Sequence, residues 1–276
     1  MKAKHTLDYL KTKSKILFLT TSNRWSGEKG GEMPKSTALA HKLAKEIGED
    51  KVTILDTTKL KIFPCEGNVS TERGNTCGVK DAILKDFKKN PSGHHRCWAS
   101  LNNPGDELWK VSKALLESDA VVFFASVRWG QLNSYYQKLI ERLTWLENRH
   151  STLGEANILK NIDAGLIVVG QNWNGAEALA TQKQVLDFFG FKIKDELFWN
   201  WQFTQDSKDE SKASYKKAAK TFKETFLQIG SIKKKHASGG TPNGLLGVRE
   251  LHPTPYINPP ILLTPIFFRS CDLLPN

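Results

Sequence analysis

The sequence predicts an α/β protein in which a parallel sheet is covered by helices on both faces. Two observations support this fold class. Short, nearly all-apolar runs alternate along the chain with longer segments of helical periodicity. These runs also lack the polar alternation of a sheet that faces water on one side, and continuous apolar strands are typical of parallel sheets buried on both faces.

Five segments have the length and composition of buried strands. They read KILFLTT, KVTILDT, DAVVFFAS, IDAGLIVVG and FKIKDELFWNW, at residues 15–21, 51–57, 119–126, 162–170 and 191–201. Five such strands separated by helices fit a three-layer, doubly wound, flavodoxin-like sheet with strand order 2-1-3-4-5. Ligands of such sheets bind at the carboxyl ends of the strands, so the loops after strands one, three and four are the ones to inspect.

Five further segments are predicted helices, at residues 36–48, 106–117, 133–148, 175–190 and 209–228. In the first, Leu39, Leu43 and Ile47 recur at four-residue steps, with Ser36 as the predicted N-cap and Gly48 as the stop signal.

The chain divides into three regions by composition. Residues 1–14 form a polar leader, and residues 15–230 form the patterned domain, which carries an irregular insertion at 58–104 rich in Gly, Asn, Cys and Pro. Residues 231–276 are a Pro- and Gly-rich tail without helical or alternating periodicity, which predicts a disordered or non-native segment.

Composition narrows the class of protein. The 276 residues carry a net charge of +11, but the lysines are spread along predicted helices and no zinc-finger or RNA-binding motif accompanies them, which argues against a nucleic-acid partner. No apolar run approaches the roughly 20 residues of a membrane span. The N-terminus also lacks the apolar core of a signal peptide, so the predicted location is the cytoplasm.

The loop after the first strand reads TTSNRWSGEKGGEMPKST and leads into a predicted helix. Backbone N–H groups and the helix dipole at such a terminus suit a phosphate. The loop matches neither a Walker A motif nor GxGxxG, because Lys29 and Pro34 stand where the former needs glycines. An ordinary polar loop before a capped helix remains the alternative.

The loops after strands three and four share a Gly–Trp–polar character. They read SVRWGQLNS, with Trp129 and Gly130, and GQNWNG, with Trp173. Glycine permits a tight turn and close approach of the backbone to a ligand. Each tryptophan alone is best explained as packing in a surface turn. Two such loops at neighbouring strand ends together predict a site for a flat aromatic ligand.

No side-chain constellation for catalysis or metal binding stands out. Cys65, Cys77, Cys97 and Cys271 have irregular spacing, and the HHRC run at 94–97 has no CxxC beside it, so free thiols are a better interpretation than a metal site. Hydrolase motifs such as GxSxG and HExxH are absent. This pattern favours a cofactor that carries the chemistry itself.

Three stretches together resemble the flavodoxin-like NAD(P)H-dependent FMN reductase family, which includes multimeric flavodoxins and iron–sulfur flavoproteins. They are KILFLTTSNRWSGEKGGEMPKSTALAHKLAKE, SDAVVFFASVRWGQLNSYYQKLIERL and GLIVVGQNWNG, and the resemblance extends from residue 15 to about 228. The chain departs from the family in residues 25–35, which look like an insertion into the phosphate loop. It also lacks the compact cysteine motif of the iron–sulfur members.

The resemblance implies a bound FMN with NAD(P)H as co-substrate. Its implied phosphate ligands are Ser22, Arg24, Ser36 and Thr37. The residues implied to surround its ring are Ser126, Val127, Arg128, Trp129, Gly130, Gln131, Gly170, Gln171, Asn172 and Trp173. No catalytic side chain is implied, because flavin N5 carries the chemistry.

The predicted function is that of an FMN-dependent NAD(P)H oxidoreductase acting on a quinone, a flavin or another small acceptor. One alternative is a flavodoxin-type electron carrier, although such carriers are usually acidic and this chain is not. Another is an FMN-free scaffold that binds a partner. The resemblance also implies a homodimer or homotetramer, for which the aromatic face of 133–148 offers a surface, unless that face packs in the core.

Overall fold

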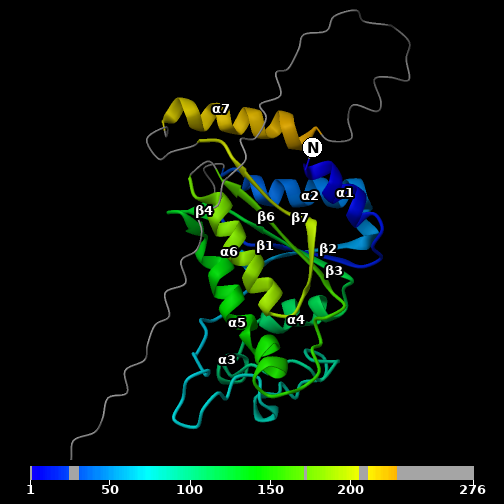
Figure 1. The fold of residues 1–276 in the computed structure, drawn as a ribbon, viewed down its shortest axis with the longest axis vertical. Helices are drawn as coiled ribbons and strands as arrows, with labels where there is room; N and C mark the ends of the chain where they lie inside the picture. The colour runs from blue at the N-terminus through cyan, green and yellow to red at the C-terminus, as the bar shows by residue number, and fades with distance from the viewer. Residues whose placement is uncertain (1, 25–30, 171–172, 205–210, 229–276) are drawn as a thin grey trace, which may run out of the picture. The chain divides into compact units, whose positions relative to one another are not determined.

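The computed structural model has a central sheet of five parallel strands in the order β2-β1-β3-β6-β7 (Figure 1). The strands are β1 Ile16–Thr20, β2 Val52–Asp56, β3 Ala120–Ala125, β6 Asp163–Gly170 and β7 Lys192–Gln202. In chain order this is 2-1-3-4-5, so the predicted flavodoxin-like fold is confirmed. The structure describes residues 2–24, 31–170, 173–204 and 211–228, all within one compact unit of residues 1–236. The predicted tail, 231–276, lies outside the described residues.

Helices cover both faces of the sheet. Figure 1 shows α1, α2 and α7 on one face and α4, α5 and α6 on the other. Their bounds are α1 Lys2–Leu10, α2 Lys35–Ile47, α4 Leu108–Leu116, α5 Ser134–Ser151, α6 Gly175–Phe188 and α7 Lys212–Phe222. Alternate residues of β1 enter the two cores: Leu17 and Leu19 pack with α4 and α5, whereas Ile16 and Phe18 pack with α1 and α2. The continuous apolar strands of the sequence are therefore explained by burial on both sides.

The predicted polar leader contains helix α1. Ala3, Leu7 and Leu10 are buried against the core, whereas Lys4, His5 and Asp8 between them are exposed. Thr6 links the helix to the sheet, since its hydroxyl donates to the Glu196 carbonyl at 2.6 Å and accepts from Trp199 Nε1 at 2.9 Å. The apolar stripe consists of only three residues, and among so many polar and charged neighbours it gives no clear helical pattern in the sequence.

Two helix details test the sequence interpretation. Gly48 ends α2 with a φ of 123°, as predicted, but the predicted N-cap is wrong: Pro34 occupies that position and Ser36 lies inside the helix.

On α5, the aromatic face packs in the core rather than on the surface, with buried side chains at Tyr136, Leu139, Leu143 and Trp145.

The insertion at 58–104 is irregular, as predicted, apart from short 3₁₀ turns and the five-residue helix α3 Trp98–Asn102. The buried Arg142 side chain of α5 contacts the insertion and pairs with Asp106, which follows it. Arg142 Nη1 donates to Asp106 Oδ2 at 2.8 Å and to the Phe63 carbonyl at 2.6 Å, and both charged side chains are fully buried. Arg142 Nη2 also lies 3.4 Å from Cys97 Sγ.

His95 belongs to the same buried network. Its ring nitrogens hydrogen-bond the hydroxyls of Ser112 at 2.8 Å and Ser100 at 2.9 Å. Burial, and after it the nearby Arg142 charge, lowers the pKa of His95 to about 4. The imidazole is therefore neutral in the folded protein at neutral pH.

This neutral histidine predicts a pH dependence of stability. Between its unfolded pKa of 6.5 and its folded pKa of about 4, the unfolded chain binds a proton that the folded chain does not. Stability should therefore fall as the pH falls, by about 2 kcal/mol between pH 7 and pH 5. Denaturant unfolding at the two pH values measures it. His95→Gln should reduce this fall in stability, whereas the control His5→Gln, at an exposed histidine, should show the same fall as the wild type. Equal stability of the wild type at both pH values would contradict a buried neutral His95.

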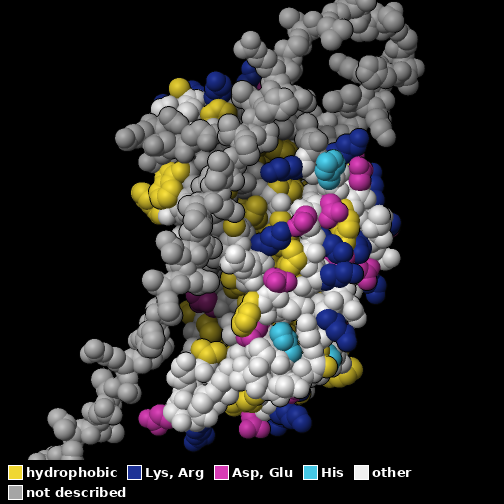
Figure 2. All heavy atoms as spheres, in the orientation of Figure 1, with side chains coloured by type: hydrophobic (Ala, Val, Ile, Leu, Met, Phe, Trp, Pro, Cys, Tyr) yellow, Lys and Arg dark blue, Asp and Glu magenta, His cyan; other side chains and the backbone are white. Residues whose placement is uncertain are grey.

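The surface shows no segregation of charge on the face drawn in Figure 2, where basic and acidic side chains are interspersed. None of the described helices has the length and apolar character needed to cross a membrane.

Candidate functional site

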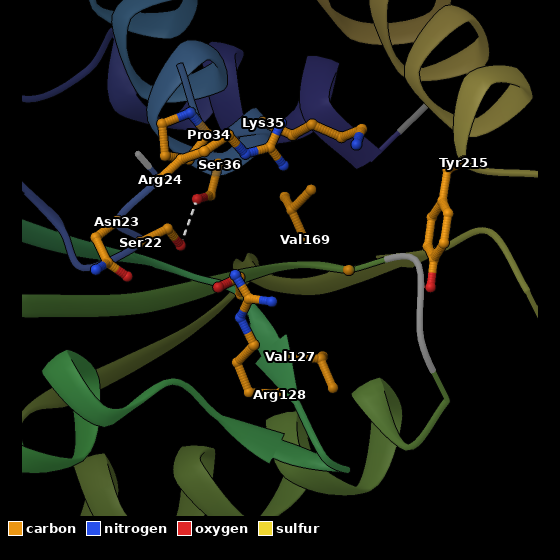
Figure 3. Close-up of a pocket in the computed structure, with 12 residues that line it drawn as sticks. Ser22, Asn23, Arg24, Pro34, Lys35, Ser36, Val127, Arg128, Val169 and Tyr215 are labelled. Carbon is orange, nitrogen blue, oxygen red and sulfur yellow. Dashed lines mark hydrogen bonds between the residues drawn. The ribbon is translucent and has the colours of Figure 1, made fainter. Parts of the chain in front are cut away.

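Three loops meet at the carboxyl edge of the sheet, after β1, β3 and β6, and enclose a pocket of about 150 Å³ (Figure 3). The pocket is lined by Ser22, Asn23, Arg24, Pro34, Lys35, Ser36, Ser126, Val127, Arg128, Val169, Gly170 and Tyr215. Seven of the predicted site residues therefore come together here: Ser22, Arg24, Ser36, Ser126, Val127, Arg128 and Gly170. The sequence interpretation did not include Asn23, Pro34, Lys35, Val169 and Tyr215.

The other predicted residues lie nearby or elsewhere. Thr37 lines a second, adjoining pocket rather than the first. Trp129, Gly130, Gln131 and Trp173 belong to the surrounding loops without lining the first pocket. Gln171 and Asn172 lie outside the described residues.

The start of α2 has the features of an anion site. Pro34 at the N-cap has no hydroxyl or carboxylate, and no side chain caps the helix. The first N–H groups of a helix have no intrahelical partner and carry the positive end of its dipole. Within the first turn, the Thr37 hydroxyl is buried with no hydrogen-bond partner, whereas the Ser36 hydroxyl donates to Ser22 at 2.8 Å. A ligand with anionic oxygens satisfies such groups.

The charges lining this pocket are all positive. Of the residues that the structure describes, Arg24, Lys35 and Arg128 line it, and no Asp or Glu does. Figure 3 shows Arg24 and Lys35 on the α2 side and Arg128 on the β4 side. Burial, and after it the Arg24 charge, lowers the pKa of the Lys35 ammonium. Arg24 also pairs with the exposed carboxylate of Glu32 at 2.8 Å. An anion in the pocket would stabilise the charged form of Lys35.

A hairpin forms the wall opposite α2. Its strands, β4 Val127–Arg128 and β5 Gln131–Leu132, are antiparallel and were not predicted. Trp129 and Gly130 form the turn with φ values of 50° and 73°, as a two-residue type I′ turn requires. A positive φ is uncommon for tryptophan, and the Trp129 side chain is 90% exposed. Such strain clusters at ligand sites.

The hairpin is fixed to the loop after β6. Asn174, with a φ of 66°, donates from Nδ2 to the Gly130 carbonyl at 2.7 Å. The Trp173 ring packs on Gly130 so closely that a β-carbon there would lie 2.7 Å from it. Gly170 has a similar role, because its β-carbon would lie 3.0 Å from the Val127 side chain. The glycines of the two Gly–Trp loops thus permit the close contact between them.

Asn133 joins the loops after β1 and β3. Its side chain accepts from Tyr136 N as the N-cap of α5, and its Nδ2 donates to Thr21 Oγ1 at 3.2 Å and Ser126 Oγ at 3.3 Å. Its position just before a helical pattern is typical of an N-cap and was the available signal for it.

The three cysteines in the described part of the chain lie outside this site. Cys65, Cys77 and Cys97 are unbridged, and among the described residues no group of three His, Cys, Asp or Glu side chains is placed to hold a metal. The HHRC run stabilises the insertion instead: besides the contacts of His95 and Cys97, Arg96 pairs with Glu155 at 2.6 Å.

Comparisons with known proteins give only distant similarities. No family model and no curated protein matches the chain. Among solved structures, RosB with bound 8-demethyl-8-formylriboflavin-5′-phosphate is 14% identical, with a TM-score of 0.48, over 93% of this chain and 99% of that chain. An azoreductase from Bacillus anthracis is 16% identical, with a TM-score of 0.43, over 76% and 99%. The flavoenzyme NAD(P)H:acceptor oxidoreductase FerB from Paracoccus denitrificans is 15% identical, with a TM-score of 0.41, over 81% and 98%.

At such identities and TM-scores these likenesses assign no function. The strand order and the site define the class of the chain: a flavodoxin-like α/β protein with a positively charged pocket at the carboxyl edge of its sheet.

Proposed function

We propose that the protein binds FMN at the carboxyl edge of the sheet and is an NAD(P)H-dependent oxidoreductase that reduces a quinone, a flavin or another small acceptor. The observation that carries the proposal is the uncapped start of α2 beside the cations Lys35, Arg24 and Arg128. An uncapped helix N-terminus with cations around it suits a phosphate monoester.

The described residues fit the two parts of FMN. Lys35 and Ser36 would hold the phosphate, with Arg24 in reach once it exchanges its contact with exposed Glu32, which is a weak pair. The ring would lie toward the hairpin and Gly170, where Trp129 supplies an exposed aromatic face.

The chain's own residues would act by binding and positioning. A bound flavin supplies the redox chemistry by accepting a hydride from NAD(P)H and passing the electrons on. Arg128, at the pocket wall, would favour negative charge on the bound ligand. Tyr215 of α7 and Asn23 border the pocket from opposite sides of the view in Figure 3, which limits how a ligand can lie.

Anaerobic reduction tests the proposal. The protein reconstituted with FMN should lose its flavin absorbance bands on addition of NADPH or NADH, and a quinone should restore them. Bands that stay oxidised with both nucleotides would support the electron carrier instead. No flavin bands after reconstitution would leave the FMN-free scaffold. The proposal includes a homodimer or homotetramer, and gel filtration of the reconstituted protein measures the oligomeric state.

Gly130→Val tests the hairpin. Valine at a φ of 73° is strained, and its β-carbon would collide with the Trp173 ring. The hairpin should therefore move away from the 173–175 loop and raise the Kd for FMN at least about tenfold, or 1.4 kcal/mol. Gly93→Val is the matched control, because Gly93 has a φ of 66° but nothing near its β-carbon position. Equal FMN affinity in the two variants would show that the hairpin is not part of the site.

A further inference from the structure

A groove separate from the candidate site lies between the edge strand β2 and helix α4. It has a volume of about 450 Å³ and shares no lining residue with the first pocket. Among the described strands, β2 has a neighbour only on the side of β1. Thr53 and Leu55 of β2 line the groove from the sheet, and Trp109, Lys113 and Ala114 line it from α4. A cleft of the size that small ligands occupy therefore follows the edge of the sheet.

The groove has two different ends, because α4 runs in the opposite direction to β2. The start of α4 lies beyond the end of β2, where the Glu107 N–H donates to the Lys61 carbonyl at 2.8 Å. After the end of α4, the Asp119 N–H donates to the Lys15 carbonyl at 2.8 Å, just before β1 begins. Trp109 therefore lies toward the end of β2, whereas Lys113 lies toward its start.

The end near Trp109 is aromatic and apolar. Trp109 is partly buried, and Leu55 and Ala114 beside it pack on the core. The Lys110 ammonium lies 5.7 Å from the centre of the indole ring. Within the described part of the chain, the indole N–H has no hydrogen-bond partner. Such a ring offers a face for stacking and a free donor to a ligand in the groove.

The other end of the groove is polar and carries a surplus of positive charge. Lys15 and Lys51 lie side by side there, because β1 and β2 are in register from Ile16 and Val52 onward. Together with Lys113 they are exposed, and they form no ion pair with any residue that the structure describes. Two exposed carboxylates, Asp50 and Glu117, also line this end. Three lysines against two carboxylates leave it suited to a single anionic group.

We propose that this groove binds a planar aromatic carboxylate, with its rings on Trp109 and its carboxylate among the lysines. Leu55 and Lys51 are about 13 Å apart along β2, at about 3.3 Å per residue. The lysine side chains reach back over part of this distance, so two fused rings with one carboxylate match the length of the groove. The site does not depend on the proposed flavin site, since the two have no residue in common.

Titration calorimetry of the full chain with 2-naphthoate and with 2-naphthamide tests the proposal. The two probes have the same ring system, but only the first is charged. We expect one saturable site per chain for 2-naphthoate, with a Kd below about 0.3 mM, and binding of the amide at least about fivefold weaker. No saturable binding of 2-naphthoate, or equal affinities for the two probes, would overturn the proposal.

Trp109→Ala locates the rings of the probe. It should raise the Kd for 2-naphthoate at least about tenfold, because it removes the stacking face. Trp129→Ala is the matched control, since Trp129 is an exposed tryptophan beside the first pocket, and it should leave this Kd within about twofold of the wild type. An equal loss in both variants, or a loss in Trp129→Ala alone, would place the probe elsewhere and overturn the assignment.

Lys51→Glu locates the carboxylate of the probe. It should raise the Kd for 2-naphthoate at least about fivefold and leave the weaker binding of 2-naphthamide nearly unchanged, because only the first probe is repelled by the new charge. Lys45→Glu has the same net charge but lies on α2, outside the groove, and should keep the wild-type Kd for both probes. Equal effects of Lys51→Glu on the two probes, or of the two variants on 2-naphthoate, would contradict the proposal.

Discussion

Asp106→Asn should destabilise the fold by about 3–5 kcal/mol, because it leaves the Arg142 guanidinium buried without a counter-charge. Asp106 accepts from Arg142 at 2.8 and 3.0 Å, and also from the backbone N–H groups of Phe63 and Leu108. The Arg142 contacts help to lower the pKa of the Asp106 carboxyl. An asparagine amide would present donors to groups that are themselves donors. Urea unfolding at pH 7 measures the loss.

Two further variants separate charge burial from general damage. Asp195→Asn removes an ion pair with Lys183 at the surface, where the carboxylate is 85% exposed, and should change stability little. Replacing both partners, in Asp106→Leu with Arg142→Met, should recover part of the stability lost in Asp106→Asn, since buried ion pairs are often replaceable by apolar groups. A full loss in the double variant, equal to that of the single one, would contradict the explanation by an unpaired charge.

Lys35→Glu should raise the Kd for FMN about 100-fold, or 2.7 kcal/mol, because it replaces a cation at the proposed phosphate with an anion. The change should not damage the helix. A glutamate in the first turn is favourable toward the dipole of α2. Titration calorimetry with FMN and with riboflavin measures the effect, and the affinity for riboflavin, which has no phosphate, should change less than threefold.

Lys45→Glu is the control for Lys35→Glu. Lys45 is exposed in the last turn of the same helix, so the variant has the same net charge without altering the pocket. Its Kd for FMN should stay near the wild-type value. An equal loss of affinity for FMN and riboflavin in Lys35→Glu would show that Lys35 does not contact the phosphate.

The sequence predicts the sheet well because burial on both faces produces long apolar runs that nothing else in the chain imitates. It fails where tertiary contacts decide local structure. Helix α1 is stabilised by the hydrogen bonds of Thr6 with β7, which lies 190 residues or more further along the chain. Hairpin β4–β5 depends on the contact of Asn174 with Gly130 across two loops.

Part of the candidate site could also be predicted from the sequence, and part could not. The loops and most of their polar residues follow from position at strand ends. The sequence does not predict that Ser36 lines the first pocket and Thr37 the second, because this depends on where α2 begins. A hydroxyl before a helical run predicts an N-cap, but Pro34 takes that position and moves both hydroxyls into the helix. Tyr215 and Lys35 reach the pocket only through the packing of α7 and α2.

The central claim is that the carboxyl edge of the sheet binds a flavin phosphate. Titration of the flavin-free full chain with FMN and with riboflavin, followed by fluorescence quenching, tests it most directly. We expect saturable binding of one FMN per chain with a Kd in the micromolar range or below, and at least tenfold weaker binding of riboflavin. No saturable binding of FMN, or equal affinity for riboflavin, would contradict the account.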